Sequence, residues 1–167
     1  GRLLIVADPD HVVDGLGALL DTASPASVVV ACAEEAQRAA IELALGPTGP
    51  APDVVAGPDG QAPQSFDDIV YFGADPDRIE ALQDLLATRG VIDIVLGGGR
   101  VGRPVAIDVG RIHYDLLRWV GTSGSDAAEG YRLVPANGEL RAGDRVAVIG
   151  AAGPMGFMHV IRTATCG

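Results

Sequence analysis

Short apolar runs alternate with amphipathic stretches along most of the chain. Runs dominated by Val, Ile, Leu and Ala are typical of strands that are buried on both faces of a parallel sheet. A weaker run at 54–56 lies inside a segment rich in Pro, Gly and Ala, 47–64, and predicts an edge strand between two loops. The stronger runs predict strands at 3–7, 27–31, 66–73, 91–96 and 119–122.

The stretches between these runs carry helix signals. Gly46 follows a stretch of strong helix formers and is placed to end a helix there. Asp75 is a candidate N-cap, and Pro76 suits the first turn of the helix that follows. The predicted helices are 12–20, 34–45 and 77–89, with a strand-to-helix passage over 108–119 and a helix or loop over 127–135.

Regular alternation of strands and helices predicts an α/β fold with three layers, in which a mostly parallel sheet carries helices on both faces. We expect the strands at 28–30, 69–71 and 94–96 to be buried neighbours in this sheet.

The stretch 144–164, DRVAVIGAAGPMGFMHVIRTA, has the order strand, glycine turn, helix. In such a turn one glycine allows a sharp bend, another lets the backbone approach a pyrophosphate, and a third lets the helix lie close to the strand. The N–H groups at the helix start then face the anion. The alternative is a tight turn that binds nothing, because Ala151 occupies the first position of a strict G-x-G-x-x-G. The predicted cofactor-binding residues are Gly150, Ala151, Ala152, Gly153, Pro154, Met155 and Gly156.

The composition of the chain argues against several classes of partner and of chemistry. The net charge is −10 over 167 residues, and all 12 basic residues are Arg. An acidic surface without lysine argues against nucleic acid and anionic membranes as partners. It also excludes a phosphate-binding lysine of the Walker type, a Schiff base and the Tyr-x-x-x-Lys pair of short-chain dehydrogenases.

Metal and targeting signals are absent from the sequence. Cys32 and Cys166 are far apart, and they form no zinc-ligand spacing with the three histidines. No apolar run of about 18 residues predicts a membrane span, and no signal peptide opens the chain, so we expect a cytoplasmic protein. The chain starts without Met and stops just after a helix, so we expect it to be a piece of something longer.

The residues from Leu140 to Gly150 follow the pattern L-x-x-G-D-x-V-x-V-x-G, which resembles the entry to the nucleotide-binding domain of medium-chain dehydrogenases. This is the family of zinc alcohol, sorbitol and threonine dehydrogenases and of quinone oxidoreductases. Residues 66–98 resemble the fourth strand, helix and fifth strand of the same Rossmann domain, and 27–46 resemble its second strand and helix.

The order of these matches predicts the domain organisation. Late elements of a nucleotide domain precede the glycine turn that should begin one. We therefore expect a Rossmann-like unit at 1–122, a connecting segment at 123–143, and the first strand and helix of a second nucleotide-binding unit at 144–167. Alternatively, 144–167 completes the first sheet.

The resemblance implies that the chain binds NAD or NADP and belongs to an oxidoreductase that acts on an alcohol or polyol, with a homo-oligomer among its possible assemblies. The family's catalytic zinc lies in a domain that this chain lacks, so we predict no metal site and no catalytic residue here, and an inactive isolated chain. The alternative is a Rossmann-like structural or subunit-contact domain that no longer binds nucleotide. The absence of a glycine turn after the strand at 3–7 supports this alternative. Cys32 stands where a ribose-binding acid is expected in the first unit. Glu34 and Glu35 follow, and there they favour a helix N-terminus.

Other candidates are weaker. His113, Tyr114 and Asp115 are adjacent, and adjacent residues do not share a helix face. His159 lies on the helix after the glycine turn and suits helix packing or the surface. The serines at 123 and 125 lack the strand–Gly-x-Ser-x-Gly–helix context of a hydrolase nucleophile.

Overall fold

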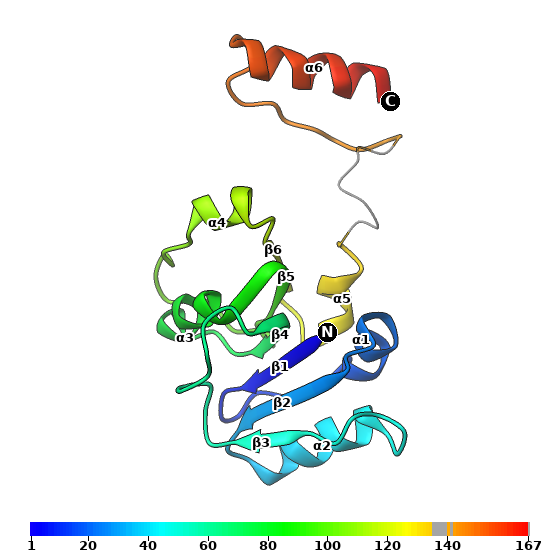
Figure 1. Cartoon of the computed structure of the whole chain (residues 1–167), viewed down its shortest axis with the longest axis vertical. Coiled ribbons are helices and arrows are strands. Elements are labelled where there is room, and N and C mark those ends of the chain that lie inside the picture. Colours follow the sequence, from blue (N-terminus) through cyan, green and yellow to red (C-terminus); the bar gives the residue numbers. More distant parts are fainter. Residues whose placement is uncertain (135–139, 141, 167) are drawn as a thin grey trace. The chain divides into compact units, whose positions relative to one another are not determined.

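The computed structural model describes residues 1–134, 140 and 142–166 (Figure 1). It divides into two compact units, Gly1–Val134 and Pro135–Gly167. None of the described helices is both long enough and apolar enough to cross a membrane. The dipeptide Asn137–Gly138, whose sequence predicts a turn, lies outside the described residues.

The first unit is built on a six-stranded sheet in which every pairing is parallel. The strand order is β3-β2-β1-β4-β5-β6, the order of a doubly wound nucleotide-binding sheet. The three-layer, Rossmann-like α/β fold expected from the sequence is therefore confirmed. Its strands are β1 (Arg2–Ala7), β2 (Ser27–Cys32), β3 (Asp53–Val55), β4 (Phe66–Phe72), β5 (Leu86–Val95) and β6 (Arg118–Thr122).

The expected neighbours are partly wrong. β4 and β5 are paired, but β1 lies between β2 and β4 and pairs with both. The first strand takes the centre because the chain winds outward from it in both directions. Its residues Leu3, Leu4 and Ile5 are accordingly fully buried.

Helices cover both faces of this sheet (Figure 1). One face carries α1, α2 and α5, whose residues Leu16, Leu19, Ile41 and Ala127 join the core beneath them. The other face carries α3 and the short 3-10 helix η1. The helices of this unit are α1 (Leu16–Ala23), α2 (Glu35–Leu45), α3 (Pro76–Leu82), η1 (Gln83–Leu85), α4 (Val109–Tyr114) and α5 (Ala127–Tyr131).

Two predicted helices have different limits in the structure. α1 begins four residues later than expected, because Gly15 adopts a left-handed conformation with φ of 73°. α3 was expected to reach Arg89 but ends at Leu82, and β5 begins at Leu86, which pairs with Phe66. Arg89 itself has φ of 68°, which no helix tolerates in its interior.

The second unit contains α6 (Pro154–Cys166), preceded by a turn and by residues 146–149. The prediction of a strand at 146–149 is wrong, because this segment pairs with no strand in the described part of the chain. A strand needs hydrogen-bonded neighbours, and apolar spacing does not supply them. Ile149 is consequently 97% exposed.

Candidate functional site

The glycine turn is formed by Gly150 to Gly153 and leads directly into α6. Gly150 has φ of 78°, a left-handed conformation that suits glycine. The Gly153 N–H donates to the Gly150 carbonyl over 3.2 Å, and the Phe157 N–H donates to the Gly153 carbonyl over 2.8 Å. Pro154 opens the helix, as the sequence predicts.

The three glycines differ in what the chain requires of them. Gly150 is required by its φ. Gly156 is required by packing, because a Cβ there would overlap the Gly150 carbonyl oxygen. Gly153 has no left-handed φ, and a Cβ built on it would meet nothing closer than the Gly150 oxygen at 3.7 Å. The chain's own packing therefore leaves the missing side chain at Gly153 unexplained.

The surroundings of the turn suit an anion. Ala152, Pro154 and Met155 are exposed. α6 is 13 residues long, and the first N–H groups of a helix that long have no partner inside it and carry the positive end of its dipole. The residues present thus fit a pyrophosphate held by backbone N–H groups.

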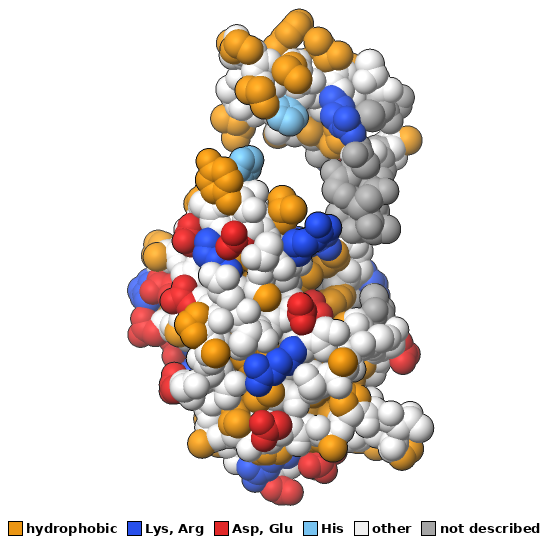
Figure 2. All heavy atoms as spheres, viewed as in Figure 1, with side chains coloured by type: hydrophobic (Ala, Val, Ile, Leu, Met, Phe, Trp, Pro, Cys, Tyr) orange, Lys and Arg blue, Asp and Glu red, His pale blue; other side chains and the backbone are white. Residues whose placement is uncertain are grey.

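A groove of about 400 Å³ lies beside the turn, within the second unit. His159 lines it together with Arg162 and Thr163 of α6, which places His159 against the 146–149 segment rather than in a catalytic cluster. Apolar side chains also gather on the outside of this unit (Figure 2). The exposed apolar residues here are Val146, Ile149, Met155, Phe157, Met158, Val160 and Ile161.

The carboxyl edge of the first sheet is the other candidate, since ligands of doubly wound sheets bind there at the point where the strand order reverses. That point lies between β1 and β4, and Tyr71 fills it. Its hydroxyl donates to the Asp8 carboxylate and accepts from the Asp75 N–H over 3.1 Å. Burial, with Asp8 beside it, raises the pKa of Tyr71. A Cβ on Gly73 would overlap both Asp8 and the Tyr71 ring, so the glycine is needed for this contact.

The loop after β1 is held by α2. The Gln37 side-chain amide donates to the backbone carbonyls of Asp8 and His11 over 2.8 and 2.9 Å. The Glu34 carboxylate accepts from the Asp10 N–H over 3.1 Å. An open crevice of about 280 Å³ lies between the loop and α2. Glu34 was expected to favour a helix N-terminus, and its contact with a loop 24 positions away carries no local sequence signal.

Cys32 ends β2 and is only 4% exposed. Burial raises the pKa of its thiol, so it is an unreactive core residue. Cys32 therefore faces the core and not a ligand-binding site. The Glu34 carboxylate, two positions later, reaches the loop where a ribose would lie in a nucleotide-binding unit.

The N-terminus of α1 is covered by the start of α5. The Ala127 N–H donates to the Asp14 carbonyl over 3.2 Å, and a Cβ on Gly15 would overlap the Asp126 carboxylate. Asp8, Asp10, Asp14, Glu34 and Asp126 therefore surround the place where a pyrophosphate would sit. Their negative charge disfavours a phosphate ligand.

The glycines after β5 also have a structural role within the first unit. Gly97 and Gly98 have positive φ, and their N–H groups donate to the carbonyls of Gly124 and Ser123, each over 2.8 Å. Ser123 therefore anchors the loop after β6 through its backbone.

The adjacent residues of α4 do not form a catalytic group. The rings of His113 and Tyr114 meet edge to face, with centroids 4.8 Å apart. The Asp115 carboxylate instead accepts from Arg111 over 2.7 Å. Within the described ranges, no group of three or more His, Cys, Asp or Glu residues could hold a metal ion.

No family model matches the chain, and no curated protein matches its sequence. The solved structures similar to it include a D-arabinose dehydrogenase from Sulfolobus solfataricus and a cinnamyl alcohol dehydrogenase from Sorghum bicolor. The identities are 19% and 22%, and the TM-scores are 0.44 and 0.43. Each similarity covers 79% of this chain but only 42% and 36% of the two dehydrogenases, so the chain spans less than half of either.

Proposed function

We propose that this chain is the NAD(P)-binding portion of an oxidoreductase that exchanges hydride between an alcohol or polyol and a nicotinamide. The turn from Gly150 to Gly156 is the cofactor-binding element, and the first unit is a scaffold that binds no nucleotide. The observation that carries the proposal is the position of Gly153, which lies in the turn directly before α6 and whose missing side chain neither φ nor packing requires. Close approach of a pyrophosphate to the backbone would require it.

The contribution of this chain to the reaction is binding and orientation. The N–H groups at the start of α6 hold phosphate oxygens, and Gly153 leaves the space for them. The nicotinamide supplies the hydride chemistry when the cofactor is bound. The alcohol or polyol substrate follows from the resemblance of residues 140–150 to the dehydrogenase pattern, and zinc would act only through a domain outside this chain.

The second candidate is a structural or subunit-contact domain that binds no nucleotide. The filled carboxyl edge of the first unit favours it, since Tyr71 occupies the switch point and carboxylates surround the α1 N-terminus. The two candidates differ only in whether the second unit binds the cofactor.

Saturation-transfer NMR with NADH, which detects weak complexes, tests the proposal on the whole chain. We expect a signal from the unaltered chain. Gly153→Ala should weaken the affinity for NADH at least tenfold, which corresponds to about 1.4 kcal/mol. The matched control is Gly17→Ala, because Gly17 lies on α1 with nothing within 4 Å of its Cβ position. Neither change alters packing, so circular dichroism should be unchanged in both. Equal NADH signals from the two variants, or none from the unaltered chain, would favour the structural domain.

A further inference from the structure

Asp93 lies in the interior of the sheet, and no described residue donates a hydrogen bond to its carboxyl group. It is on β5, between β4 and β6, and it is fully buried. Among the described residues neither of its carboxylate oxygens has a hydrogen-bond partner, and no ion pair reaches it. A charged carboxylate in such a place is strongly disfavoured.

α5 is the element that covers this carboxyl group. Gly130 of α5 lies so close that a Cβ on it would overlap the Asp93 carboxylate. α5 is only five residues long, and it is the last helix before the second unit begins at Pro135. β5 is held by strands on both sides, so α5 is the element that opens at the smaller free-energy cost.

The other charged groups around Asp93 do not balance the charge of its carboxylate. On α5 and its cap, Arg132 pairs with Asp126 over 3.5 Å, and Glu129 accepts from the Thr122 hydroxyl over 2.5 Å. The remaining ionisable groups on the elements packed here are Asp67, Asp68 and Tyr71 of β4, Arg89 of β5, Tyr131 of α5, Arg118 of β6 and Asp21 of α1.

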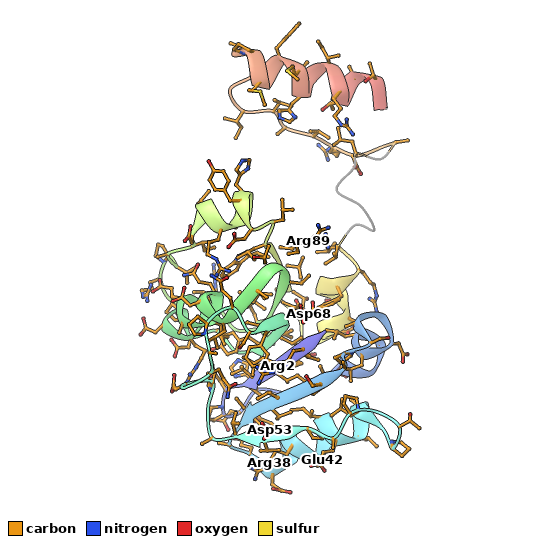
Figure 3. All side chains as sticks on the ribbon, viewed as in Figure 1. Arg2, Arg38, Glu42, Asp53, Asp68 and Arg89 are labelled. Carbon is orange, nitrogen blue, oxygen red and sulfur yellow. The ribbon has the colours of Figure 1, made fainter. Side chains whose placement is uncertain are left out.

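Asp68 adds a second acidic group on the same face. It lies on β4 (Figure 3). Tyr131 of α5 is close to its carboxyl group, but the Tyr131 hydroxyl has no hydrogen-bond partner among the described residues. Burial raises the pKa of Asp68 and also that of Tyr131. Burial, with the nearby Asp126 carboxylate, raises the pKa of Asp93 to about 7.

We infer that Asp93 is a proton-operated latch for α5. The neutral acid allows α5 to lie on the sheet. When the proton leaves to solvent, the carboxylate gains hydration only if α5 moves away. Opening therefore releases the last helix of the first unit.

The direction of the pH effect follows from linkage. In the closed state Asp93 holds its proton to about pH 7, whereas an open, hydrated Asp loses it near pH 4. The open population must rise as the pH increases from about 4 to about 7, and then level off.

Hydrogen exchange followed by mass spectrometry on the whole chain tests the latch. After correction for intrinsic rates, we expect protection of the α5 amides at 127–131 to fall at least tenfold between pH 5 and pH 8. At pH 8 it should be at least tenfold below that of the β5 amides at 91–95. Asp93→Asn cannot ionise and should lose most of this change, leaving only the part that comes from Asp68.

Two further variants keep the test decisive. Asp93→Val replaces Asn if that variant does not fold, since a β-branched residue suits a buried strand. Glu42→Gln removes an exposed carboxylate from α2 and should keep the original pH dependence. The latch is overturned if the Asp93 variants keep that dependence, or if α5 and β5 show equal protection at pH 8.

Discussion

The Tyr71 hydroxyl donates to the Asp8 carboxylate and so joins the carboxyl ends of β4 and β1. These two strands flank the point where the strand order reverses, which is where doubly wound sheets hold their ligands. The same hydroxyl accepts from the Asp75 N–H at the start of α3. One buried side chain thus closes the first unit's ligand position and ties three elements together.

Tyr71→Phe should destabilise the chain by about 1–3 kcal/mol, since it leaves the Asp8 carboxylate and the Asp75 N–H without this partner. Urea unfolding followed by fluorescence of Trp119, the only tryptophan, measures this. Tyr114→Phe is the matched control, because Tyr114 is 82% exposed and should change stability by less than about 0.5 kcal/mol. Equal effects of the two changes would mean that the buried contact contributes nothing.

The pH dependence of global stability should follow the buried acids. The pKa of Asp93 is raised to about 7, so the folded chain binds more protons than the unfolded chain between about pH 4 and pH 7. The free energy of unfolding should therefore fall by about 1–3 kcal/mol from pH 4.5 to pH 7.5, less than the full pKa difference because α5 can open. Urea unfolding at several pH values gives the slope. The burial of Asp68 acts in the same direction, so Asp93→Val should reduce the slope without abolishing it.

Local pattern predicted the strands of the first unit because their burial requires it. The runs that became β1 and β2 consist of Val, Ile, Leu and Ala, and nearly all of these residues are buried. α2 was predicted from its strong helix formers and from Gly46, which does end it with φ of 65°. Asp75 caps α3 by accepting from the Asp77 N–H over 2.9 Å, again as expected.

Strand order and element limits could not be predicted in this way. Order depends on which crossovers pack onto the sheet, so nothing in the run at 3–7 shows that β1 is central. Leu86 fits both the apolar face of a helix and a buried strand, and its pairing with Phe66 decides between them. The segment 146–149 has the apolar spacing of a strand, but spacing alone supplies no partner.

The candidate site was predictable only where its residues are contiguous. The turn from Gly150 to Gly156 is visible as a spacing, although the separate roles of its glycines needed coordinates. The contact between Tyr71 and Asp8 joins residues 63 positions apart, and neither has a local signal. Asp93 interrupts an apolar run in the sequence, but its lack of any donor becomes visible only when α5 is in place.

The first unit should not discriminate NAD from NADP. Cys32 is buried in the core rather than open to a ribose, so Cys32→Asp should place a carboxylate among apolar side chains and destabilise the chain by about 2–4 kcal/mol. Cys32→Ala keeps the position apolar and should cost about half as much. Urea unfolding measures both. A measured cofactor preference above about tenfold, roughly 1.4 kcal/mol, that Cys32→Asp abolished would contradict this.

We expect the purified 167-residue chain to bind dinucleotide weakly and to turn over no alcohol or polyol, with or without added zinc. Hydride exchange with an alcohol needs one group that polarises the oxygen and another that handles its proton. A catalytic zinc takes three protein ligands and an open position, and the described residues contain no such group. His113 contacts the Tyr114 ring and His159 lines the groove of the second unit, so neither is joined to a second catalytic group.

The glycine turn can hold a pyrophosphate but performs no chemistry. The segment before it pairs with no described strand, and Ile149 is accordingly almost fully exposed. Nicotinamide absorbance, followed with a panel of alcohols and sugar alcohols, measures turnover directly. Gly153→Ala provides the control, because any genuine cofactor-dependent rate must fall when the turn is obstructed. Reproducible NAD(P)-linked oxidation of a sugar alcohol that this variant lost would show that a catalytic group lies among the residues assigned here to packing.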